Sequence, residues 1–360
     1  MASETLRCDI EAPVVPEDDL MHYRKFRSEV KKETRKLEKP EACYICGSDS
    51  AKFCKSHSIP RFCLGELAVE GKLLTAAYLF ESNLFTDKVG VGEALTFKAI
   101  CQKCDTEFFK KYETPTTLLE RPDMQVLGQI AAKNLLREIS KARHKLALRE
   151  ALGAEASSDL GAAAAVRQID LEEDMKAFRV AKDAGRRNGG GVPYEVVFYK
   201  VLPYVAPIAF QQMISPVADF DGELINNCFN PNPRYKMEPL HVCVLPLKGN
   251  TAVLAFHSKR AKRYRRFRGQ LKDRDLDGQL LAFVKLLFAY SEDILISPRI
   301  EPIVRGSAEL ASLARMNRSY LCRSNDPRNA SAVSLQACCA DFAVDDLPSP
   351  PNLLLPEYAI

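Results

Sequence analysis

Two pairs of cysteines with the same short spacing constrain the fold of this 360-residue chain more than any other feature. Cys43 and Cys46 form one C-x2-C turn, and Cys101 and Cys104 form a second. Such a turn supplies two thiolate ligands from one tight loop, and a structural zinc ion takes four ligands in a tetrahedron. The sequence therefore predicts one structural Zn²⁺ site that joins two distant segments.

Cys54 and His57 form a rival ligand pair with C-x2-H spacing, which could complete a site with the first cysteine turn alone. We favour the four cysteines because Cys101 and Cys104 lie at an expected strand-to-helix junction, the place where a treble-clef finger holds its second ligand pair. The second turn would otherwise have no partner. This assignment leaves His57 free for chemistry.

Composition and charge narrow the class of protein. With 46% hydrophobic and 27% charged residues, the chain has enough apolar side chains for one large or two moderate cores. No apolar run approaches the roughly 20 residues of a membrane span, and charge near the N-terminus argues against a signal peptide. We therefore expect a cytoplasmic protein without membrane contact, whose 12 cysteines are thiols or ligands rather than disulfides.

A basic segment between residues 259 and 274 is the first candidate for phosphate binding, although the net charge of +4 is too small to predict a nucleic-acid partner. Tyr264, Phe267 and Leu271 are spaced i, i+3, i+7, which is typical of a helix with these side chains buried and its basic face exposed. The predicted nucleic-acid-binding residues are Lys259, Arg260, Lys262, Arg263, Arg265, Arg266 and Arg268.

A second basic stretch, residues 24–39, contains interspersed glutamates. That pattern favours an exposed helix with ion pairs between residues three or four apart.

The order of elements predicts an α+β fold. A helix is expected over residues 124–148, with Asp123 as its N-cap, and strands are expected over 194–205, 241–246 and 251–257. We divide the chain into a helical lead-in (1–42), a treble-clef zinc module (43–115), a helical linker region (116–188), an α+β C-terminal domain (189–323) and a loosely held tail (324–360).

The zinc module carries a resemblance. Its two cysteine turns, the segment Ser56-His57-Ser58-Ile59-Pro60 between them, and Asp105 directly after the last cysteine resemble the zinc-stapled HNH, or ββα-metal, endonucleases of bacteria. The resemblance covers residues 43–113, and the C-terminal half resembles only uncharacterised bacterial proteins. It implies a ββα-metal fold, which is a treble clef.

The resemblance also implies chemistry. His57 aligns with the histidine that acts as general base, Asp105 with a ligand of the catalytic Mg²⁺ or Mn²⁺, and Asn83 is assigned by position to the asparagine that orients the base. Ser56 departs from the pattern, because the family has an acidic residue or a histidine there. Glu113 is eight residues beyond Asp105, on the order of 12 Å along a helix, too far to share one ion.

The expected function is therefore metal-dependent hydrolysis of phosphodiester bonds, with DNA as the preferred substrate and RNA as a possible one. The alternative, favoured by Ser56, is a non-catalytic protein on a degenerate nuclease fold, which binds nucleic acid or another protein.

Overall fold

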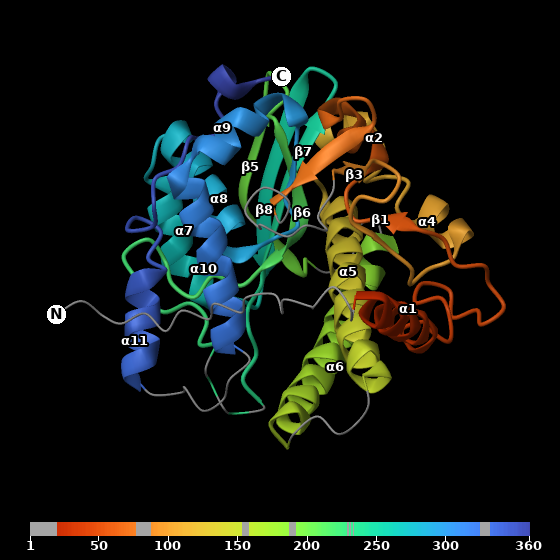
Figure 1. Cartoon of the computed structure of the whole chain (residues 1–360). Coiled ribbons are helices and arrows are strands. Elements are labelled where there is room, and N and C mark those ends of the chain that lie inside the picture. Colours follow the sequence, from red (N-terminus) through yellow and green to blue (C-terminus); the bar gives the residue numbers. More distant parts are fainter. Residues whose placement is uncertain are drawn as a thin grey trace.

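The chain forms an α+β structure, as predicted, in which helices cover both faces of one large sheet (Figure 1). The computed structural model describes residues 20–76, 88–152, 158–186, 192–228, 230, 232, 234–324 and 332–360. Within these ranges, no helix is both long enough and apolar enough to cross a membrane.

The large sheet is antiparallel at every described pairing, with the order β3-β2-β9-β6-β7-β8-β5. Strand β7 lies inside it and is buried along its whole length. Val242 and Val244 pack on one face of the sheet, while Cys243 and Leu245 pack on the other, as alternation along a strand requires. The strands are β2 (Lys72–Thr75), β3 (Val89–Gly90), β5 (Tyr194–Leu202), β6 (Ile208–Ile214), β7 (Leu240–Leu247), β8 (Asn250–Ser258) and β9 (Leu295–Ile296).

One face of the sheet is covered by helices from the C-terminal part of the chain (Figure 1). Phe283 of α8 and Phe267 of α7 are fully buried in the core on this face. Asp275 caps the start of helix α8 by accepting a hydrogen bond from Gly278 N at 2.9 Å. The helices are α7 (Arg265–Lys272), α8 (Leu276–Tyr290), α9 (Glu301–Gly306), α10 (Ala308–Ser324) and α11 (Ala332–Asp341).

The other face is covered by the zinc module and by a pair of long helices, α5 (Met124–Ala151) and α6 (Ser158–Arg186). Asp123 caps α5, as predicted, by accepting a hydrogen bond from Val126 N at 3.0 Å. The two helices approach closely at Gly128, where an added Cβ atom would lie 2.4 Å from a backbone nitrogen of α6. Glycine is needed there because any larger residue would push the helices apart.

The zinc module contains a two-stranded antiparallel sheet, called the His57 hairpin below, whose strands are remote in the sequence and which is followed by a helix. Strands β1 (Ser56–His57) and β4 (Thr96–Phe97) pair antiparallel, and α4 (Gln102–Phe108) begins directly after Cys101. Helix α2 (Arg61–Leu67) lies between the strands in the sequence, and the exposed helix α1 (Leu20–Leu37) leads into the first cysteine turn.

Two of the expected divisions differ from the structure. Strands β2 and β3 belong to the zinc-module segment, yet they extend the C-terminal sheet through pairing of β2 with β9. Residues 324–360 were expected to form a loosely held tail, but residues 342–360 of it are packed against the fold: Leu353 and Leu354 are buried, and Tyr204 Oη donates to Leu354 O at 2.8 Å. The apolar residues between the prolines provide this packing.

Candidate metal centre and the lysine site beside it

The four cysteines of the favoured ligand set lie together. The sulfur atoms of Cys43, Cys46, Cys101 and Cys104 all lie within 4.8 Å of one another, and the Cys46 and Cys101 sulfurs are 3.9 Å apart. Four sulfurs at about 2.3 Å from a zinc ion in a tetrahedron would be separated by about 3.8 Å. The donor set therefore fits Zn²⁺, and the protein fills every position, which is typical of a structural site.

The backbone of the two turns favours the thiolate form of one ligand. Burial alone would raise the pKa of Cys43, but the backbone N–H groups of Cys46, Cys101 and Ile45 lower that pKa to about 7. The N–H of Cys101 donates to Cys43 Sγ at 3.3 Å. Metal binding by cysteine requires loss of the thiol proton, so these N–H groups prepare Cys43 for it.

Cys54 and His57, the rival ligand pair, form hydrogen bonds with backbone carbonyl groups instead. Cys54 Sγ donates to Ile100 O at 3.5 Å, and burial raises the pKa of this thiol to about 12, so it stays protonated. His57 Nε2 lies 2.9 Å from Val91 O. A carbonyl oxygen only accepts, so Nε2 carries a hydrogen, and in the neutral ring Nδ1 keeps its lone pair. Nδ1 is therefore the His57 atom that could accept a proton.

Strand β1 directs its two side chains to opposite sides. His57 lies opposite Thr96 and Ser56 lies opposite Phe97 in the pairing with β4. Successive side chains of a strand alternate between faces, so Ser56 faces α4 and is buried, while His57 is only half-buried.

A buried lysine connects Ser56 to α4. Ser56 Oγ donates to Asp105 Oδ1 at 2.6 Å, and Lys133 Nζ of α5 donates to the same Oδ1 at 2.9 Å and to Ser56 Oγ at 3.0 Å. Lys133 Nζ also pairs with Glu113 Oε1 at 3.0 Å and lies 3.8 Å from the centre of the Phe109 ring. These five residues are called the lysine site below.

Lys133 is an internal cation, since its side chain is 1% exposed. A buried charge is tolerated only when it is paired and hydrogen-bonded, and two carboxylates, a hydroxyl and an aromatic face meet this need. Its ammonium lies between Ser56 and Asp105, the two positions that the resemblance relates to the catalytic ion. The assignment of Asp105 to such an ion stays a prediction, and its Oδ1 is bound by Lys133.

The distance argument for Glu113 was wrong. It assumed a helix running from Asp105 to Glu113, but α4 ends at Phe108 and the chain turns, so both carboxylates contact the same nitrogen atom. Lys133 itself was missed, although the sequence carried a signal: it follows Val126 and Ile130 on the buried stripe of α5, where a charged residue needs an explanation.

The same stripe carries a second polar contact, between α5 and the end of α8. Arg137 donates to Thr96 O at 3.1 Å and pairs with Asp293 at 3.5 Å, and Lys141 pairs with the same carboxylate. Burial would raise the pKa of Asp293, but Lys141 and Arg137 lower it below its ordinary value, so this carboxylate stays charged. Helix α5 is therefore joined to both the hairpin of His57 and the sheet.

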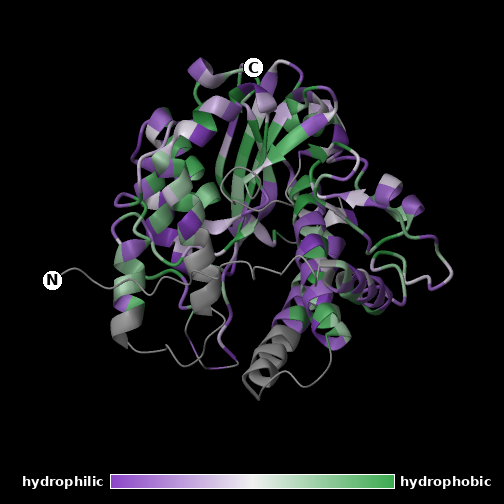
Figure 2. Cartoon of the chain, viewed as in Figure 1, coloured by the Kyte–Doolittle hydropathy of each residue, from purple (hydrophilic) through white to green (hydrophobic). Residues whose placement is uncertain are grey.

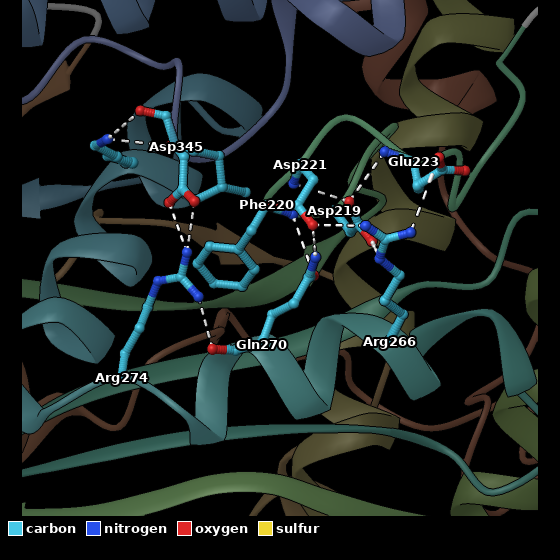
Figure 3. A network of polar contacts seen from close by, with 10 residues as sticks. Asp219, Phe220, Asp221, Glu223, Arg266, Gln270, Arg274 and Asp345 are labelled. Atoms are coloured by element: carbon cyan, nitrogen blue, oxygen red, sulfur yellow. Dashed lines mark hydrogen bonds and ion pairs between the residues drawn. The ribbon is translucent and has the colours of Figure 1, made fainter.

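Four arginines of the basic segment around α7 form ion pairs within the fold, and two of them, Arg266 and Arg274, are shown in Figure 3. Arg266 Nε pairs with Asp219 at 3.1 Å and the same guanidinium also contacts Asp221, while Arg274 pairs with Asp345 at 2.6 Å. Arg263 and Arg268 likewise have acidic partners, Glu238 and Glu195 respectively. Of the residues predicted to bind nucleic acid, the exposed ones without an ion pair in the described part of the chain are Lys259, Arg260, Lys262 and Arg265.

The apolar side of this segment is as predicted, since Tyr264, Phe267 and Leu271 are buried. Asn83, predicted to orient His57, lies in residues 77–87, outside the described residues.

In comparisons with known proteins, no family model matches this chain, and no curated protein or solved structure is significantly similar to it. The HNH resemblance therefore stays a prediction based on the zinc module.

Proposed function

We propose that this protein is a zinc-stabilised nucleic-acid-binding protein, built on an HNH-like module that has exchanged its catalytic metal for an internal lysine. One observation carries the proposal: Lys133 Nζ lies 3.0 Å from Ser56 Oγ and 2.9 Å from Asp105 Oδ1. A divalent ion at the same oxygens would have to displace a buried ammonium or lie beside it as a second positive charge.

The lysine cannot take over the work of a metal ion. Hydrolysis of a phosphodiester by metal catalysis requires a cation in contact with the phosphoryl oxygens and the leaving group. The Lys133 side chain is 1% exposed and its hydrogen-bond donors face Ser56, Asp105 and Glu113. It therefore stabilises the fold of the module and does not reach a bound backbone.

A supercoiled plasmid with Mg²⁺ or Mn²⁺ tests this proposal, with zinc content measured on the same sample. We expect no nicking by zinc-loaded protein, together with salt-dependent binding of the plasmid. Nicking that disappears in the His57→Ala variant would refute the proposal. Absence of both nicking and binding would favour the protein-interaction alternative.

A second candidate is the metal-dependent HNH-like endonuclease with His57 as general base, acting mainly on DNA. The observation in its favour is the hydrogen bond to Val91 O at 2.9 Å, which orients the His57 ring and leaves Nδ1 able to accept a proton from water. In that case Lys133 must move before Asp105 can ligate the ion, so Lys133→Met would change the metal concentration needed for half-maximal cleavage.

A further inference from the structure

Helix α1 carries a concentration of positive charge that the fold does not neutralise. Between Leu20 and Leu37 it has seven lysine and arginine residues and two glutamates. In the described part of the chain, the ion pair of Lys36 with Glu33, at 3.0 Å, is the one that forms within this helix. Lys31, Lys32 and Arg35 are exposed and make no ion pair there, in contrast to Arg266 and Arg268 of α7.

These cations share one side of the helix. A hollow of about 470 Å³ is lined by Ser28, Lys31, Lys32, Arg35 and Lys36. Figure 2, viewed as in Figure 1, shows α1 as a largely hydrophilic helix that lies beside α5. This set of five residues is called the α1 basic face.

The α1 basic face is held in a fixed position. Thr34 is buried on the opposite side of α1, where the helix packs against α5. Arg143 of α5 donates to Glu38 O at 3.3 Å, to Lys39 O at 3.0 Å and to Tyr44 Oη at 3.3 Å. Tyr44 lies inside the first cysteine turn, so the same arginine ties the end of α1 to the metal centre. A ligand would bind a preorganised surface.

We propose that the α1 basic face binds the phosphate backbone of a nucleic acid, an inference that rests on the proposed function and names the surface responsible for it. Residues 31–36 span about 7.5 Å of helix, and duplex DNA carries one charge per about 1.7 Å of its axis. The backbone therefore offers about four phosphates over the length of the face. The positive charges of the α1 basic face are therefore complementary to the negative charges of a nucleic-acid backbone.

A membrane surface is the less suitable partner. An interfacial helix buries an apolar face in the lipid, and the apolar side of α1 already packs against α5. The large apolar side chains of α1 recorded as exposed are Met21, at 78%, and Phe26, at 52%.

The test measures fluorescence anisotropy of labelled duplex DNA, single-stranded DNA and RNA over a range of salt concentrations. The variant Lys31→Gln/Lys32→Gln/Arg35→Gln removes three charges from the α1 basic face. We expect weaker binding and a salt slope smaller by about 2.7, at 0.9 per lost phosphate contact for duplex DNA. The control variant Lys72→Gln/Lys200→Gln/Lys248→Gln has the same charge change at exposed lysines outside both basic segments, and it should bind like wild type.

The outcomes distinguish failure of the α1 basic face as the binding surface from failure of nucleic-acid binding as the function. Unchanged binding by the α1 variant, or equal losses in both variants, would overturn the α1 basic face while leaving nucleic-acid binding in place. If wild type binds no nucleic acid, the proposed function fails and the surface proposal with it. The surface proposal would also be overturned if wild type bound anionic phospholipid vesicles in place of nucleic acid and the α1 variant lost this binding. Circular dichroism and zinc content confirm that each variant is folded.

Discussion

Replacing Lys133 tests whether the lysine site needs a positive charge and whether the Lys133 ammonium supplies it. Lys133→Met keeps most of the buried stem and removes the charge, which leaves Asp105 and Glu113 without their shared partner. Breaking a buried ion pair typically costs about 3–5 kcal/mol. The two carboxylate side chains are 18% and 32% exposed, so water screens part of the loss and we expect about 3 kcal/mol.

Lys133→Ala separates the charge from the stem. It removes three further methylene groups from a buried position, at about 0.8 kcal/mol each, so we expect a total loss of about 5 kcal/mol. It also leaves a space bordered by Ser56, Asp105 and Glu113, whose oxygens suit Mn²⁺ or Ca²⁺. At 100 times the dissociation constant, such an ion would restore about 2.7 kcal/mol.

The assay is urea denaturation of wild type, Lys133→Met and Lys133→Ala, each with and without Mn²⁺ or Ca²⁺, in the presence of zinc. We expect the ions to stabilise Lys133→Ala selectively. The reasoning is refuted if Lys133→Met loses less than about 1 kcal/mol, the upper range for an exposed pair, or if the ions stabilise wild type as much as the alanine variant.

Three further predictions concern other parts of the fold. Cys101→Ala should lower the zinc content measured by mass spectrometry, while Cys54→Ala, outside the cluster, should leave it unchanged. Burial, with Glu138 and other acidic groups nearby, raises the pKa of Asp174 from 3.8 to about 8. The folded state therefore keeps a proton that the unfolded state loses, stability falls as pH rises through this window, and Asp174→Asn should gain stability over wild type between pH 4 and pH 8 in thermal melts. Gly128→Ala should lower the melting temperature because its Cβ would meet α6 at 2.4 Å, whereas Gly269→Ala, with open space around it, should not.

The parts of the structure that the sequence predicted are those determined locally. The cysteine turns, the Asp123 cap of α5 and the buried stripe of α7 each depend on residues a few positions apart. Strand β9 is different: it has two residues and is held by pairing with β2 and β6, which are remote in the sequence. Such pairing is decided by tertiary packing, so no short pattern could have shown it.

The candidate site likewise has a part that the sequence predicted locally and a part that only tertiary packing brings together. The spacing of the cysteines identified the four side chains that could hold a metal ion, but the partner of Asp105 comes from α5, and only the fold brings Lys133 to it. The acidic partners of α7 were also hidden, because Asp219 and Asp345 lie far from Arg266 and Arg274 in the sequence. A basic segment can therefore not be taken as a phosphate-binding surface until its internal ion pairs are known.

The charged residues of α5 add polar contacts between the zinc module and the sheet, which are also joined by the pairing of β2 with β9 and by a shared apolar core. Lys133, Arg137 and Lys141 are four residues apart, so they follow one side of the helix. Lys133 binds the carboxylate of Asp105 directly after the last cysteine, Arg137 binds the hairpin of His57, and Arg137 and Lys141 bind Asp293 beside the sheet. Each contact is directional, unlike apolar packing, so we expect them together to favour this orientation of the module on the sheet. Loss of zinc would therefore release Asp105 and disturb the whole row, and the His57 hairpin would lose its position even though His57 does not touch the metal.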